Sequence, residues 1–237
     1  MYAFALDFDG VICDSIKECC KTSYNTFRTL YPQDSFDCEI PLDWVRLFYI
    51  NRGLVRPASD YLRLWKWIVD DTKNKAIPLQ TLAQVYCSET ELSDFKNLFL
   101  QLRWKSIQED PKLFVRDNPF YREILEIWKS IPFPKYIVTT KDEKSTRFLL
   151  ANYQFEISGL FTQSFGTKPK ALQEISQIHQ IELSNVRFVD DNPEHIKDCR
   201  SAGATCGFIG WGYGPYFDHD MPRIDTSNEL LEFFYHE

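Results

Sequence analysis

Apolar and polar residues follow two different patterns along the chain, and the change between them divides the sequence. A short apolar run at positions 3–6 has the length and composition of a buried strand. Between about residues 16 and 115, apolar residues recur every three or four positions, which predicts amphipathic helices without an intervening strand. From about residue 116 onward, short apolar runs alternate with helical stretches.

The second pattern predicts a parallel sheet, because strands that alternate with helices are joined by crossovers that cover both of its faces. The strands are expected at 135–139, 160–164, 186–189 and 205–209. The helices around them are expected at 123–128, 143–150, 169–179, 193–202 and 229–235. The helices of the first pattern are expected at 16–30, 60–72, 79–86 and 91–107. The predicted fold class is therefore α/β. Residues 1–15 and 116–237 form a doubly wound, Rossmann-like core, and residues 16–115 form an inserted helical domain.

Composition narrows the classes of function. The 237 residues are 44% hydrophobic and 16% aromatic, which is enough for one core and an inserted module. A net charge of −7 argues against a surface for nucleic acid or for an anionic membrane. The odd number of cysteines and the lack of a C-x-x-C pair favour free thiols over a disulfide framework or a zinc site. No apolar run is long enough to cross a bilayer and no signal segment precedes the first strand, so a cytoplasmic protein is expected.

Polar residues follow four of the expected strands at the point where each strand ends. Asp7 and Asp9 end the first strand on one side of it, and Gly10 lets the chain turn directly afterwards. Similar groups follow later in the chain: Thr139, Thr140 and Lys141, then Lys168 and Lys170, then Asp190 and Asp191. Because right-handed crossovers place the carboxyl ends of parallel strands at one edge of the sheet, these residues are expected to meet there.

These residue types suit phosphoryl transfer. One carboxylate can attack phosphorus, and a second can protonate the leaving oxygen and later activate water. A hydroxyl and an ammonium can hold the phosphoryl oxygens. Oxygen ligands without a histidine or cysteine cluster favour Mg²⁺ over zinc.

With these residues in place, the chain resembles hydrolases of the haloacid dehalogenase superfamily. The likeness is to the phosphatase branch, and to phosphoglycolate-phosphatase-like members with a helical cap inserted after the first motif. That motif, D-x-D-G, is here Asp7-Phe8-Asp9-Gly10. The resemblance implies that Asp7 is the nucleophile and Asp9 the general acid and base. It further implies that Mg²⁺ binds Asp7, the backbone carbonyl of Asp9, and Asp191, with Asp190 as second choice for the last ligand.

The resemblance also assigns residues to the substrate phosphate. The strand-end hydroxyl of the family corresponds to Thr139, with Thr140 beside it, and the family's lysine corresponds to Lys168, with Lys170 as the alternative. His195 stands where relatives often carry a further acid. Asp9 favours a phosphatase over a dehalogenase, because a carbon–halogen bond breaks without a proton donor whereas an alkoxide needs one.

The implied function is a Mg²⁺-dependent phosphatase that acts on a small phosphorylated metabolite through an aspartyl-phosphate. A phosphomutase of the same superfamily and a non-catalytic regulatory or binding member remain alternatives, and the oligomeric state stays open. Five cations of the helical insertion could meet an anionic substrate or belong to solvated helix faces: Arg52, Arg56, Arg63, Lys66 and Arg103. The glycine-rich run Gly210–Gly214 is read either as a substrate loop or as a tight turn with aromatic packing.

Overall fold

A computed structural model describes residues 1–33, 37, 39–70, 82–214 and 221–235. The chain divides into two compact units. The α/β unit comprises Met1–Asp14 and Pro119–Glu237, and the helical unit comprises Ser15–Asn118. The junctions thus follow Asp14 and Asn118, whereas the sequence-based boundaries follow residues 15 and 115.

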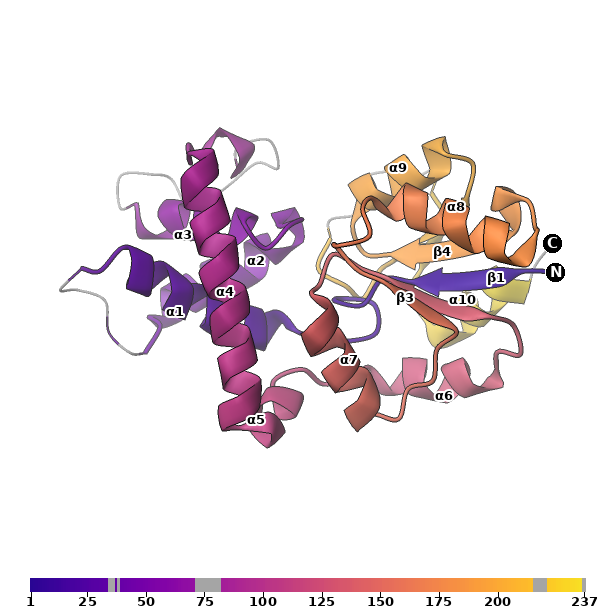
Figure 1. The fold of residues 1–237 in the computed structure, drawn as a ribbon, viewed down its shortest axis with the longest axis horizontal. Helices are drawn as coiled ribbons and strands as arrows, with labels where there is room; N and C mark the ends of the chain where they lie inside the picture. The colour runs from indigo at the N-terminus through magenta and orange to yellow at the C-terminus, as the bar shows by residue number, and fades with distance from the viewer. Residues whose placement is uncertain (34–36, 38, 71–81, 215–220, 236–237) are drawn as a thin grey trace. The chain divides into compact units, whose positions relative to one another are not determined.

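The α/β unit is built on a six-stranded sheet in the order β3-β2-β1-β4-β5-β6, and each of its strand pairs is parallel (Figure 1). The strands are β1 (Ala3–Leu6), β2 (Lys135–Val138), β3 (Gly159–Phe161), β4 (Val186–Asp190), β5 (Thr205–Ile209) and β6 (Arg223–Ile224). The helices of this unit are α6 (Arg122–Ser130), α7 (Glu143–Asn152), α8 (Lys168–His179), α9 (Pro193–Ser201) and α10 (Ser227–Tyr235), with a 3₁₀ turn at Leu183–Asn185. The expected doubly wound α/β sheet is confirmed.

Alternation along the central strand β1 decides which helices cover which face. Ala3 and Ala5 pack with residues of α8 and α9 on one face of the sheet. Phe4 points to the other face, where its ring lies 4.4 Å from that of Phe234 in α10. Figure 1 shows α8 and α9 on one side of the sheet and α6 and α10 on the opposite side. Residue 7 therefore continues the row of side chains that faces α8.

Some elements differ from those expected. The two-residue strand β6 is too short to show a period in the sequence, and it joins the sheet through backbone bonds such as Gly210 N–H to Ile224 O. The strand expected at 160–164 ends at Phe161. Of the helix expected at 79–86, the first three residues lie outside the described ones, and Leu82–Gln84 form a 3₁₀ turn. The helix expected at 60–72 ends at Val69, and residues 71–72 lie outside the described ones.

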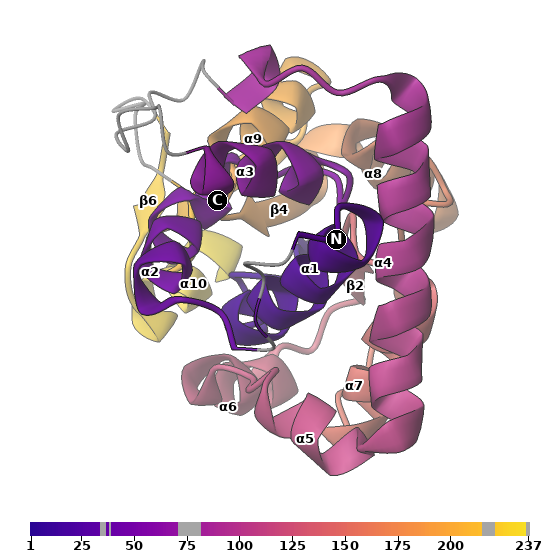
Figure 2. The same cartoon turned by 90° about the vertical axis from the view of Figure 1, so that its left-hand side faces the viewer.

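The helical unit has an aromatic core of its own. Its helices are α1 (Ile16–Leu30), α2 (Leu42–Asn51), α3 (Asp60–Val69), α4 (Glu89–Glu109) and α5 (Pro111–Arg116), with 3₁₀ turns at Arg52–Leu54 and Leu82–Gln84. The long helix α4 lies alongside α1 (Figure 2), and a capping box between Ser88 and Glu91 begins it. Trp65 of α3 is fully buried, and its ring stacks on that of Phe48 with the ring centroids 5.4 Å apart.

The cysteines that the structure describes are buried thiols without a disulfide, and Cys38 lies outside the described residues. Among the helices formed by described residues, none combines the length and the apolar character that crossing a membrane requires.

Candidate active site

The carboxyl ends of β1 and β4 bring two acidic residues side by side. Leu6 pairs with Val189 in the parallel register, and the N–H of Asp7 donates a hydrogen bond of 2.9 Å to the carbonyl of Val189. Asp7 and Asp190 thus end neighbouring strands. Asp7 is 6% exposed and Asp190 is completely buried. Two carboxylates buried this closely need compensating positive charge.

Lys168 supplies one positive charge from the start of α8. Thr167 caps this helix by accepting the N–H of Lys170, which makes Lys168 the first helical residue. Its Nζ lies 2.8 Å from Asp7 Oδ1 and 2.7 Å from Asp190 Oδ2. The ammonium of Lys170 instead lies over the ring of Phe165, 5.4 Å from its centroid. Of the two lysines left open by the sequence, Lys168 is the one that contacts these acids.

The ammonium of Lys168 affects the pKa values of Asp7 and Asp190 to different extents. Burial raises the pKa of Asp7, and Lys168 opposes this rise only in part. Burial acts in the same direction on Asp190, yet Lys168 and His195 hold the pKa of that carboxyl below its usual range. The two carboxylates in turn outweigh burial at Lys168 and raise its pKa, so the lysine stays charged. The site therefore holds an ammonium, an ionised Asp190, and an Asp7 that needs further positive charge.

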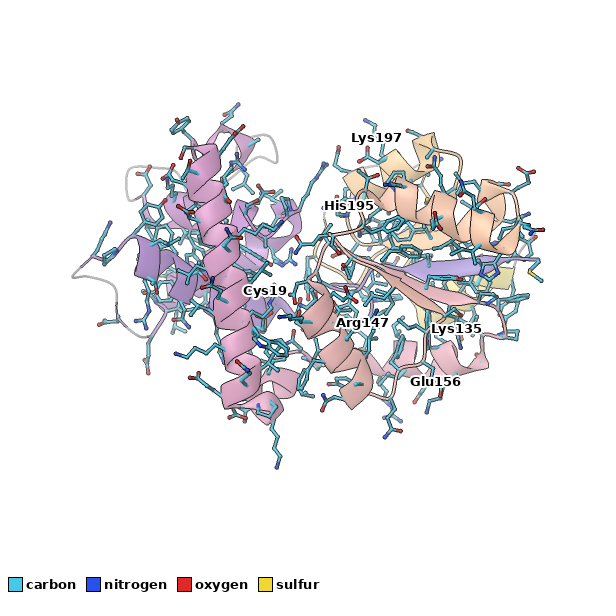
Figure 3. The ribbon with its side chains drawn as sticks, viewed as in Figure 1. Cys19, Lys135, Arg147, Glu156, His195 and Lys197 are labelled. Atoms are coloured by element: carbon cyan, nitrogen blue, oxygen red, sulfur yellow. The ribbon has the colours of Figure 1, made fainter. Side chains whose placement is uncertain are left out.

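Asp190 and Asp191 are adjacent in sequence but have different partners. Asp190 accepts the N–H of Asn192 at 2.8 Å, and Nδ1 of His195 lies 3.2 Å from its Oδ2. His195 is labelled in Figure 3 at the beginning of α9. Asp191 instead accepts the backbone N–H of Tyr213 at 2.6 Å. Lys168, Asn192 and His195 thus hold Asp190 within the protein, whereas Asp191 is bound to a different loop.

The acids at this edge form a donor set that fits Mg²⁺. One carboxylate oxygen from each of Asp7, Asp190 and Asp191 lies within 4.8 Å of the others, and all three residues are buried. Carboxylate oxygens are hard ligands of the kind that Mg²⁺ prefers. Three acids around one ammonium leave an excess of negative charge that a divalent cation would offset.

Asp9 lies at the same edge and has a cationic partner of its own. Nζ of Lys141 is 3.0 Å from Asp9 Oδ1 and 3.4 Å from Oδ2. The Lys141 side chain is completely buried, and that of Asp9 is 14% exposed. The hydroxyl of Thr139 accepts the backbone N–H of Lys141 at 3.2 Å, while Thr140 is half-buried beside it. The residues that follow β2 thus bring an ammonium to Asp9, and two hydroxyls directly precede that lysine in the chain.

The turn after β1 depends on glycine. Gly10 has a φ of +82°, a conformation that residues with a side chain rarely adopt. A Cβ at this position would also overlap the Asp191 carboxylate. Gly10 therefore allows both the turn after Asp9 and the approach of Asp191.

Solved structures of other proteins share this architecture. A haloacid dehalogenase-like family hydrolase from Streptococcus pneumoniae aligns with a TM-score of 0.65 and 17% identity, over 99% of this chain and 98% of its own. A predicted phosphoglycolate phosphatase from Haemophilus somnus aligns with a TM-score of 0.66 and 17% identity, over 98% of this chain and 97% of its own. The chain has the haloacid dehalogenase-like fold.

Sequence comparison gives a shorter match. A curated relative, enolase-phosphatase E1 from Persephonella marina, is 27% identical over 121 residues, which is 47% of this chain and 53% of that protein. The chain therefore matches about half the length of this relative. No family model matches the sequence.

Several contacts of this site carry no role in the sequence-based predictions. Lys141 directly follows the strand-end threonines, so its position was a usable signal for the contact with Asp9. His195 was noted for the acid it replaces, and its contact with Asp190 came from the structure. The backbone contact from Tyr213 to Asp191 carries no side-chain signal in the sequence, because any residue except proline offers an N–H.

Several cations of the helical unit are already paired within it. The carboxylate pairs are Arg103 with Glu18, Lys66 with Glu91, and Arg63 with Asp60. Arg103 and Glu18 are both buried, so Arg103 is a structural residue and not a substrate contact as the sequence allowed. The guanidinium of Arg52 lies over the ring of Tyr61 at 5.3 Å, and Arg56 is exposed.

Proposed function

We propose that this chain is a Mg²⁺-dependent phosphatase that hydrolyses a small phosphorylated metabolite through an aspartyl-phosphate on Asp7. The observation that carries the proposal is the ammonium of Lys168, which lies between Asp7 and Asp190 within a cluster of buried acids. An enzyme that attacks phosphorus with a carboxylate needs such a cation to keep that carboxylate ionised and oriented. The proteins named above, a predicted phosphoglycolate phosphatase and an enolase-phosphatase, support the same class of reaction.

In the first half-reaction, a carboxylate oxygen of Asp7 attacks phosphorus, and the bond between phosphorus and the substrate oxygen breaks. Asp9, in its protonated form, donates its proton to that leaving oxygen, and the alcohol departs. Lys168 holds Asp7 in place and weakens its repulsion from the anionic substrate. The hydroxyls of Thr139 and Thr140 donate hydrogen bonds to phosphoryl oxygens, and the ammonium of Lys141 adds a further cation close to them.

In the second half-reaction, Asp9 removes a proton from water, and the water oxygen attacks phosphorus. The bond from phosphorus to Asp7 breaks, which releases inorganic phosphate and restores both side chains. A Mg²⁺ ion would be held by the carboxylates of Asp7 and Asp191 and by the carbonyl of Asp9. When bound, it would supply positive charge against the phosphoryl oxygens. Asp190 holds Lys168 in place through their ion pair, and it is the second choice, after Asp191, as a ligand of Mg²⁺.

The test is hydrolysis of p-nitrophenyl phosphate by the full chain with Mg²⁺, comparing the parent with Asp7→Asn. The variant keeps the shape of the side chain but lacks the nucleophilic carboxylate, so turnover should fall by at least about a thousandfold. Asp198→Asn is the matched control, because Asp198 is an exposed residue of the same unit, and its activity should equal that of the parent. An Asp7→Asn variant within tenfold of the parent would refute the assignment of the nucleophile. A screen of sugar phosphates, phosphoglycolate, nucleotides and pyrophosphate would then define the substrate.

A further inference from the structure

A loop that the proposed reaction does not use lies directly against Asp191. This loop, Trp211–Gly214, follows β5, and the N–H of Tyr213 donates to Asp191 Oδ2 at 2.6 Å. A Cβ at Gly212 would overlap the Asp191 side chain, and a Cβ at Gly214 would overlap its backbone carbonyl. A Cβ at Gly10 would overlap the Asp191 carboxylate as well, so Asp191 occupies space that three glycines leave free.

The same loop is fixed to the segment that follows the first motif. The hydroxyl of Tyr213 donates to Asp14 Oδ1 at 2.9 Å and lies 3.4 Å from the carbonyl of Cys13. Nε1 of Trp211 donates to the carbonyl of Val11 at 3.3 Å. The loop is therefore held at both of its aromatic side chains, and the N–H of Tyr213 has a defined position.

An oriented N–H matters for a carboxylate that binds a cation. A hydrogen bond to one oxygen fixes the rotation of the carboxylate and directs its other oxygen, and such partners of metal ligands affect metal affinity by about 10- to 100-fold. Asp190 obtains its orientation from an ammonium, a ring nitrogen and the N–H of Asn192. Asp191 receives a hydrogen bond from this loop.

We propose that the loop Trp211–Gly214 is the outer shell of the cation site, in which Tyr213 is a positioning residue that orients Asp191 through its backbone N–H. The glycines on either side of Tyr213 bring the main chain close enough for this contact. The aromatic side chains keep the loop in register with Val11–Asp14. This inference rests on the proposed function for the presence of a cation at Asp191.

The experiment measures Mg²⁺ binding to the metal-free full chain by isothermal titration calorimetry, without substrate. Gly212→Ala places a methyl group against Asp191, and we expect its affinity for Mg²⁺ to fall at least about tenfold. Gly210→Ala is the matched control, because a methyl group there would meet the side chain of Asp225 and not Asp191. Its affinity should stay within about threefold of the parent, a smaller change than the loss of an outer-shell contact causes.

A double-mutant cycle tests whether the loop acts through Asp191. In an Asp191→Asn chain, adding Gly212→Ala should weaken the remaining binding by less than about twofold, because the two changes remove the same contribution. Equal tenfold losses in both backgrounds would overturn the inference, as would parent-like binding by Gly212→Ala or a parent that does not bind Mg²⁺. The phosphatase assay is separate. If the parent hydrolyses phosphate esters and Gly212→Ala binds Mg²⁺ as tightly as the parent, the role of the loop is refuted and the proposed function stands. If the parent binds Mg²⁺ but does not hydrolyse phosphate esters, the proposed function is refuted, and the role of the loop is judged from the binding data alone.

Discussion

Replacing Lys168 by methionine would remove the charge between the buried acids while keeping a side chain of similar length. Lys168 is 6% exposed, and its Nζ is within 2.8 Å of both Asp7 and Asp190. In Lys168→Met the two carboxylates would face each other in a buried site without this ammonium. We therefore expect the folded α/β unit to lose stability, even though methionine is the more apolar residue.

The size of the loss follows from the burial of the pair. Removing one partner of a buried ion pair costs about 3–5 kcal/mol, because the remaining charge stays desolvated. In a chain of 237 residues this corresponds to a fall in Tm of about 6–20 °C. The double variant Lys168→Met/Asp190→Asn should recover part of this lost stability, since it removes one of the two buried carboxylates that have lost the ammonium.

The assay is thermal unfolding in EDTA, followed by circular dichroism, for the parent, for Lys168→Met, for Asp190→Asn and for the double variant. At pH 7 the carboxyls of Lys168→Met have pKa values raised by burial and by each other, so their charged forms destabilise the fold. Lowering the pH toward 5 protonates them and should narrow the gap to the parent. A Lys168→Met chain that melts within about 2 °C of the parent at pH 7 would refute this reasoning, because a broken buried pair shifts Tm by more.

Two further predictions concern the helical unit. The buried Glu18 carboxylate accepts two hydrogen bonds of 2.9 Å from Arg103, and Arg103→Met would leave it buried without them. The free energy of unfolding, measured in urea, should fall by about 3–5 kcal/mol and recover in part when Glu18→Gln is added. An Arg103→Met chain as stable as the parent would contradict this. The pKa of Glu91 is lowered from 4.5 to about 2, chiefly by its hydrogen bond from Lys66. The charged form of Glu91 thus stabilises the fold fully above pH 4.5, and this stabilisation is lost as the pH falls through 2. The Tm of Glu91→Gln should therefore lie furthest below that of the parent at pH 7, and the difference should be smaller at pH 3. An equal difference at both pH values would count against the contribution of the charged Glu91.

The core of the fold could be predicted because its signals are local. A few adjacent residues suffice to recognise the apolar runs of β1, β4 and β5, the Asp142 cap of α7 and the proline at the start of α9. The edge strand β6 was missed because two residues have no period. The expected helix at 79–86 failed in its described part, since apolar spacing alone does not separate an α-helix from a 3₁₀ turn.

The candidate site was predictable as far as parallel topology determines it. Asp7, Asp190 and Lys168 meet because β1 and β4 end, and α8 begins, at the same edge of the sheet. Sequence position does not separate Lys168 from Lys170, because both lie in the first turn of α8. Their side chains differ in direction: Lys168 contacts Asp7, whereas Lys170 lies over the ring of Phe165. The pairing of Arg103 with Glu18 joins residues on two helices, and a single sequence contains no signal for that distance.

The place of β1 in the sheet has a consequence for synthesis on the ribosome. β1 is made before its neighbours, yet it pairs with β2 at residues 135–138 and with β4 at residues 186–190. At about 5–20 residues per second, it waits roughly 10–40 s for β4 to be made. The helical unit is continuous in sequence and can complete its core during that interval. Until β2 has been made, the nascent chain therefore carries the helical unit next to an apolar strand that has no strand to pair with. The carboxylates of Asp7 and Asp190 meet only after β4 has been made.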